Sequence, residues 1–275
     1  NLNGAGTRAY SQIGNGGYGG AVAGNTFGNI IVDTDGLLTL LSGTGSDAYT
    51  QIGHGGRLRT GNHGATGEMI SVTADGGVSM SGNTGTRTYT QIGNGGHEAF
   101  GTHNSDVKVD ASGGVTGGNI TLAGGNGAGS YASIGNGGSS ATADLGAMNS
   151  NGDIDVDARG NLTMTAGSND GHARIGHGGE LLNGTITDAQ IYVDVVGAIT
   201  MTANTANSDG SNAQIGHGGF NSYNVGVTNS DIFINTLAGT GTGDLSINGR
   251  VQMVTTVSMR HTPEPSPWAM LPIFY

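Results

Sequence analysis

The sequence predicts an all-β fold, a parallel β-helix (β-solenoid) of about six coils, in which each coil is one repeat of roughly 40 residues with three strands. The first observation is a pentapeptide, Ile-Gly-[Asn/His]-Gly-Gly, that recurs six times at intervals of 39, 40, 42, 41 and 40 residues. The second is composition: 56 of 275 residues are glycine and 11% are charged, without a strict Gly-X-Y period, which excludes collagen. We expect the first residues of the pentapeptides to form one buried column: Ile13, Ile52, Ile92, Ile134, Ile175 and Ile215.

Each repeat contains three short segments in which apolar and polar residues alternate, the pattern of strands with one buried face. One repeat shows them as 154–157, 162–165 and 173–175. The alternation directs Ile175 inward and Arg174 outward. Equivalent residues of successive coils then stack about 4.8 Å apart. Two coils of about 20 residues per repeat remain an alternative, and the segments that follow each pentapeptide are expected to be variable surface loops.

The chain divides into two parts by composition. Residues 1–259 are expected to form the solenoid, and residues 260–275 form a tail that holds all four prolines and the only tryptophan. Proline at that density interrupts a strand ladder. The first residues lack the basic segment and apolar core of a signal peptide, and they begin inside a repeat. We therefore expect the chain to be a piece of a longer protein.

Charge and cysteine content exclude several classes of protein. The formal net charge is −11 and the single lysine is Lys108, which argues against binding to nucleic acid or to anionic lipid. Cysteine is absent, so the fold has no disulfide framework and stacking must stabilise it. A secreted repeat protein fits these features.

Two polar columns are candidates for metal binding. Outward aspartates on consecutive coils would repel one another unless screened, and Ca²⁺ could bridge them because it prefers oxygen ligands; the three are Asp110, Asp157 and Asp194. Histidine alternates with asparagine at the third pentapeptide position, in His54, His177 and His217 against Asn15, Asn94 and Asn136. Because asparagine replaces histidine there, we interpret this column as a hydrogen-bonding ladder and not as a metal site. No other cofactor is predicted.

Three further features bear on function. An aromatic column could stack sugars or simply form a ladder: Tyr10, Tyr49, Tyr89 and Tyr131. The second strand of each repeat exposes hydroxyls, with complete Thr-x-Thr pairs at 163–165 and 200–202, so ice or mineral binding is an alternative function. A β-helix polysaccharide lyase or hydrolase would need a non-repeating cluster of carboxylates and basic residues. Here the acidic residues recur with the repeat, so we predict that the chain is not an enzyme.

The Tyr-x-Gln-Ile-Gly-[Asn/His]-Gly-Gly repeats, with interleaved strands such as Asn-Leu-Thr-Met-Thr-Ala, resemble filamentous-haemagglutinin-type bacterial surface proteins over about residues 9–248. That resemblance implies a right-handed β-helix, an extracellular or cell-surface location, and an adhesive or biofilm role with cell-surface or matrix polysaccharide, or other copies, as partners. The tail, with Pro263-Glu264-Pro265, resembles a PEP-type sorting signal that stops before its membrane-spanning helix. Membrane attachment would then require a segment that the chain lacks.

Overall fold

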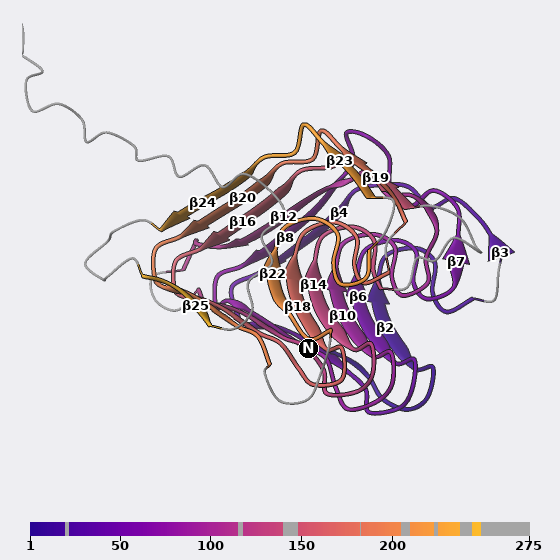
Figure 1. Cartoon of the computed structure of the whole chain (residues 1–275), viewed down its shortest axis with the longest axis horizontal. Coiled ribbons are helices and arrows are strands. Elements are labelled where there is room, and N and C mark those ends of the chain that lie inside the picture. The colour runs from indigo at the N-terminus through magenta and orange to yellow at the C-terminus, as the bar shows by residue number, and fades with distance from the viewer. Residues whose placement is uncertain are drawn as a thin grey trace, which may run out of the picture.

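The computed structural model describes residues 1–19, 22–114, 118–139, 148–181, 183–204, 210–222, 225–236 and 244–248. In these residues the chain is all-β, and its strands pair in parallel to form the predicted solenoid (Figure 1). The part of the chain so described includes no helix long and apolar enough to cross a membrane. The expected Pro-rich tail and its boundary after residue 259 lie outside the described residues.

Three long sheets form the solenoid, and we name them by the side chains that distinguish them. The hydroxyl sheet contains β1 (Leu2–Gly4), β5 (Leu38–Ser42), β9 (Val78–Ser81), β13 (Ile120–Ala123), β17 (Leu162–Thr165), β21 (Ile199–Thr202) and β25 (Leu245–Asn248). The tyrosine sheet contains β2 (Tyr10–Ile13), β6 (Tyr49–Ile52), β10 (Tyr89–Ile92), β14 (Tyr131–Ile134), β18 (His172–Ile175) and β22 (Ala213–Ile215). The aspartate sheet contains β4 (Ile30–Thr34), β8 (Met69–Ala74), β12 (Asp106–Ala111), β16 (Ile154–Ala158), β20 (Ile191–Val195) and β24 (Ile232–Thr236).

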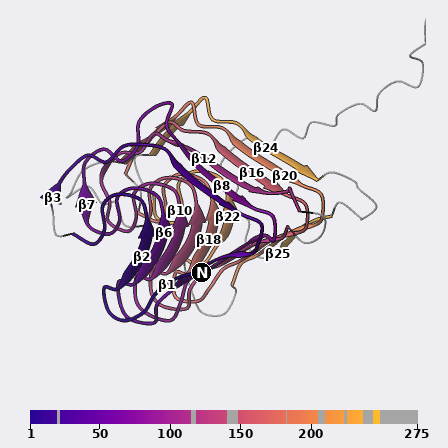
Figure 2. The same ribbon diagram turned by 180° about the vertical axis from the view of Figure 1, so that it is seen from behind.

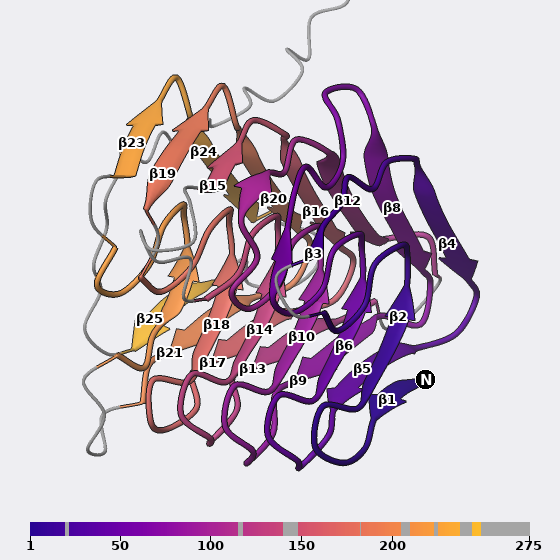
Figure 3. The ribbon, with the colours of Figure 1, turned by 90° about the vertical axis from the view of Figure 1, so that its right-hand side faces the viewer.

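The register establishes that one repeat makes one coil. Ile92 pairs with Ile134 in the tyrosine sheet, and Val109 pairs with Val156 in the aspartate sheet, each one full repeat further along the chain. The alternative of two coils per repeat is therefore wrong. Figure 3 shows the coils side by side, with the colour advancing steadily from the first coil to the last.

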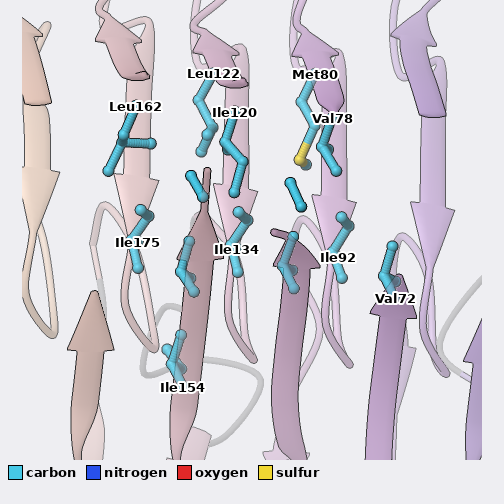
Figure 4. Close-up of a cluster of buried hydrophobic side chains, with 14 of the residues drawn as sticks. Val72, Val78, Met80, Ile92, Ile120, Leu122, Ile134, Ile154, Leu162 and Ile175 are labelled. Carbon is cyan, nitrogen blue, oxygen red and sulfur yellow. The ribbon is translucent and has the colours of Figure 1, made fainter. Parts of the chain in front are cut away.

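The core is a set of apolar columns between the three long sheets (Figure 4). Ile52, Ile92, Ile134 and Ile175 have no exposed surface, so the predicted isoleucine column is buried along these coils. In the terminal strands of the sheet, Ile13 is 38% exposed and Ile215 is half-buried. Burying one such side chain fully contributes about 1.5–3 kcal/mol, and a neighbouring coil on each side is what completes the burial.

Each repeat also contributes a short fourth strand that the three-strand prediction missed. These flank strands are β3 (Val22–Ala23), β7 (Arg59–Thr60), β11 (Gly101–Thr102), β15 (Met148–Ser150), β19 (Gly184–Thr187) and β23 (Val225–Thr228). They form one four-stranded and one two-stranded sheet. Figures 1 and 2 show β3 and β7 beyond the tyrosine sheet, on the side away from the core. Part of what we expected to be variable loop is therefore regular structure.

The flank segments bury the outer face of the tyrosine sheet. Every residue of β6, β10, β14 and β18 is buried, without the alternation that a half-exposed strand would show. Arg174 does point away from the core, as predicted, but it is only 1% exposed. This sheet lies between two packed layers, whereas the hydroxyl and aspartate sheets keep one face in solvent.

Candidate functional site

The tyrosine column lies inside the protein. Successive rings of Tyr10, Tyr49, Tyr89 and Tyr131 stack with centroids 4.7–5.0 Å apart, and His172 continues the stack at 5.0 Å. Tyr49, Tyr89 and Tyr131 have no exposed surface, and burial raises the pKa of all three hydroxyls. A sugar therefore has access only to Tyr10, which is 47% exposed. This corrects the hypothesis of a sugar-binding column: these rings form a structural ladder.

The pentapeptide wraps around these rings, which explains why its glycines recur. Gly93 has φ = 146°, and an added Cβ there would collide with the carbonyl of Gly135 in the next coil. At Gly96 an added Cβ would lie 2.6 Å from the Tyr89 hydroxyl oxygen. The second position of the pentapeptide, Gly93, needs glycine for its backbone conformation and for the close approach of the next coil. The last needs it because the tyrosine of the same coil occupies the space.

The glutamine before each isoleucine joins one coil to the next. The Gln51 side-chain amide donates to the carbonyls of Gly93 and Gly95 at 2.9 and 3.0 Å, and both acceptors belong to the following pentapeptide. Gln91 makes the equivalent contact to Gly135 at 3.0 Å. The recurring spacing of the motif thus gives the Gly93 and Gly135 carbonyls a side-chain donor. It gives the Gly95 carbonyl a second donor besides the backbone N–H of Gly56.

Histidine and asparagine are interchangeable at the third pentapeptide position because each provides one acceptor and one donor. The backbone N–H of Asn136 donates to His177 Nδ1 at 3.0 Å, and the backbone N–H of Asn94 donates to Asn136 Oδ1 at 2.9 Å. The other ring nitrogen of the histidine serves as the donor: His217 Nε2 donates to the backbone carbonyl of Ala189 at 2.9 Å. These rings are thus held neutral, and burial lowers the pKa of His177 to about 3 and of His217 to about 4. The hydrogen-bonding interpretation is confirmed.

A cluster of charged side chains, with Arg57 and Asp47 buried at its centre, lies where the flank segments cover the tyrosine sheet. The Arg57 guanidinium contacts Glu98 at 2.8 Å and Asp47 at 3.2 Å, and it lies over the ring of Tyr18 at 5.5 Å. Arg87 contacts the same Asp47 carboxylate at 2.7 Å. Sequence reasoning missed this cluster. The sequence does contain a signal for it. The residue two positions before the tyrosine alternates in charge from coil to coil, at Arg8, Asp47 and Arg87.

The predicted aspartate column is present on the outer face of the aspartate sheet. Asp110 pairs with Asp157, and Asp157 pairs with Asp194, on consecutive coils. A cation from the chain already reaches it, because Lys108 Nζ lies 2.8 Å from Asp155 and 3.1 Å from Asp157. Within the described residues, no three histidine or carboxylate side chains gather into a group suited to a metal ion. Calcium bridging of this column remains a prediction.

The hydroxyl sheet presents a regular column of hydroxyls at its first outward position. Thr121 pairs with Thr163, and Thr163 pairs with Thr200. Thr39, Ser79 and Ser246 continue the same column in the other coils. The second column is mixed, with Leu41, Ser81, Ala123, Thr165, Thr202 and Asn248. The strands β13, β17 and β21 alternate between buried and more exposed residues, so this face is open to solvent and mostly polar.

No protein-family model matches the chain, and searches of curated proteins and of solved structures give no match either. The class of protein therefore rests on the fold itself. It is a parallel β-solenoid with two sheet faces open to solvent and a third sheet enclosed by its own flank segments.

Proposed function

We propose that this chain is a structural and adhesive segment of a secreted or surface-displayed bacterial repeat protein. It binds cells, matrix polysaccharide or further copies of itself through the outer faces of the aspartate and hydroxyl sheets. The proposal rests on one observation: the polar residues fall into a set that is buried between coils and a set that faces solvent. The tyrosines, glutamines and pentapeptide histidines make contacts from one coil to the next inside the protein, while each open face carries a run of one kind of polar side chain, hydroxyls on one sheet and aspartates on the other.

Repetition supports a binding role more than a single reactive centre. Each open face contains a run in which one kind of side chain repeats at the spacing between strands, about 4.8 Å: threonines at 121, 163 and 200, and aspartates at 110, 157 and 194. Such a surface suits a partner that is itself long and repetitive, because several weak contacts then act together. The described residues offer this arrangement along successive coils of both open sheets.

The test is binding by the folded chain to bacterial cells and to immobilised matrix polysaccharides, with sedimentation to measure self-association. Thr163→Lys with Thr200→Lys alters the hydroxyl face, Asp194→Lys alters the aspartate face, and Asp35→Lys in an exposed turn serves as the control. We expect one of the face variants, and not the control, to reduce binding. Absence of any binding or self-association by the unaltered chain would refute the adhesive function.

A second candidate is ice or mineral binding, and the unbroken hydroxyl column of the hydroxyl sheet favours it. Regularly spaced hydroxyls on a flat sheet can hold water in an ordered array, although threonine also suits strands for reasons of propensity alone. Thermal hysteresis and inhibition of ice recrystallisation measure this activity directly. Activity abolished by Thr163→Lys with Thr200→Lys would favour this function over adhesion.

A further inference from the structure

One end of the aspartate sheet carries an aromatic pair, one ring exposed and the other half-buried, that the structural ladders do not use. Tyr192 and Phe233 pair in register on β20 and β24, and their rings stack with centroids 5.1 Å apart and planes 7° apart. Tyr192 is 37% exposed. The tyrosine column is enclosed by flank segments, but this pair stands on an open sheet face, where it is accessible to a partner.

Carboxylates surround this pair. In the strand register Asp155 lies beside Tyr192, and Asp194 lies two positions along β20 on the same face. Burial raises the pKa of the Tyr192 hydroxyl, and the negative charges of Asp153, Asp231 and Asp155 raise it further. The aromatic pair therefore lies among negatively charged side chains.

The negative charge of the whole face is only slightly compensated. The outward positions of the six strands carry one basic residue, Lys108, against six aspartates: Asp33, Asp106, Asp110, Asp155, Asp157 and Asp194. Lys108 contacts two of these carboxylates. Asp194 lies beyond it, and among the described residues no hydrogen bond or ion pair engages its carboxylate. A partner for this face needs positive charge to complement it.

We propose that the face formed by Tyr192, Phe233, Asp155 and Asp194 binds a cationic polysaccharide, one whose sugar units carry free amino groups. The apolar face of a sugar ring packs against the aromatic surface, and its ammonium group pairs with the Asp194 carboxylate, since Asp155 already contacts Lys108. A flat sheet that repeats along the solenoid axis suits an extended polymer. This inference rests on the proposed adhesive function and names the chemical class of its partner.

The test uses soluble glucosamine oligomers as the probe and their N-acetylated counterparts as the comparison, at mildly acidic pH, where amines are protonated and aspartates ionised. Binding is measured by calorimetry with the folded chain. We expect the glucosamine oligomer to bind, and acetylation and added salt both to weaken binding, because they remove or screen the charge attraction. Equal binding of the acetylated oligomer would overturn the proposal.

A pair of matched double variants tests whether this ring and this carboxylate form the binding site. Tyr192→Thr introduces a β-branched residue that suits a strand, and Asp194→Asn gives the residue that already stands at this register in the next coil, Asn235. Together the two changes should weaken glucosamine binding about tenfold. Phe27→Ala with Asp35→Asn removes an exposed ring and an exposed carboxylate elsewhere, and it should change binding little. Both proteins should keep the melting temperature of the unaltered chain.

Poly-lysine provides the last comparison. If poly-lysine binds as tightly as the glucosamine oligomer and Tyr192→Thr affects neither, charge alone attracts polycations and the proposal is overturned. If instead the chain binds cells or other polysaccharides undisturbed by the Tyr192 and Asp194 changes, the adhesive function stands and this site assignment fails.

Discussion

The Nδ1 atom of His177 accepts a hydrogen bond from the backbone N–H of Asn136, 3.0 Å away in the preceding coil. Asn136 makes the same contact through Oδ1 to the backbone N–H of Asn94 at 2.9 Å. A neutral imidazole and an amide thus perform the same task, which is to satisfy a buried backbone donor. The ladder accepts either residue, but only the histidines make it sensitive to pH.

The first prediction compares two replacements of His177. His177→Asn retains an acceptor for the Asn136 N–H, so we expect a loss of less than about 1 kcal/mol in the free energy of unfolding. His177→Ala leaves that buried N–H without a partner and should cost about 1–3 kcal/mol. Denaturant unfolding measures both. Equal losses would show that the hydrogen bond contributes nothing and that only the packed ring matters.

The second prediction concerns acid. Burial lowers the folded-state pKa of His177 and His103 to about 3, below the ordinary value of 6.5. Between these values the unfolded chain binds more protons than the folded chain, so stability falls as pH falls from about 6.5 towards 3. One pH unit below 6.5, the lowered pKa of each such histidine reduces the free energy of unfolding by about 1.4 kcal/mol.

Melting temperature against pH measures this loss. The variant that combines His177→Asn with His217→Asn serves as the control because it keeps the acceptors and removes two titrating rings. Its stability should fall less steeply below pH 6.5 than that of the unaltered chain. Parallel curves for the two proteins would attribute acid sensitivity to other groups.

The period and the alternation were sufficient to predict the coils, because inward residues such as Ile92 and Ile134 recur in every repeat and must be buried together. They could not predict the cover over Tyr89 or Arg174. Alternation states which side of a strand a residue occupies, whereas burial on the outer side depends on another segment. Here that segment is the glycine-rich one after each pentapeptide, and its flank strands, such as the two residues Arg59–Thr60 of β7, are too short to show a period.

The candidate sites likewise contain features that the repeat predicts and features that it does not. The register of Asp110, Asp157 and Asp194 followed from the repeat, and the structure places them side by side. The bridging by Lys108 was not predicted, since it depends on the conformation of one long side chain. The pair Tyr192 and Phe233 occurs in only two repeats, so a search for recurring residues passes over it.

The third prediction tests the core. Ile134 is fully buried in the middle of the isoleucine column, and Ile134→Ala should lower the free energy of unfolding by about 2–5 kcal/mol. Ile134→Asp buries an unpaired charge and should prevent folding. Ile31 is 72% exposed on the aspartate sheet, so Ile31→Ala is the control and should change stability little. A small effect of Ile134→Asp in denaturant unfolding would contradict the buried column.

The fourth prediction concerns the ammonium of Lys108. Lys108→Gln removes the positive charge between Asp155 and Asp157 and leaves their mutual repulsion. Since these groups are partly exposed, the loss in the free energy of unfolding should be only about 1 kcal/mol. It should shrink in high salt, which screens the repulsion. A loss independent of salt would assign the role of Lys108 to packing of its aliphatic stem.

The last prediction addresses calcium. Lys108 already neutralises part of the column formed by Asp110, Asp157 and Asp194, so a divalent cation must compete with its ammonium there. We therefore expect millimolar Ca²⁺ to raise the melting temperature of Lys108→Gln more than that of the unaltered chain, since a ligand that binds only the folded state stabilises it. Adding Asp157→Asn to Lys108→Gln removes the central carboxylate and should abolish the response. A response that survives Asp157→Asn would place the ion elsewhere. If none of the three proteins responds to Ca²⁺, the aspartates form a solvated face whose only bound cation is the Lys108 ammonium of the unaltered chain.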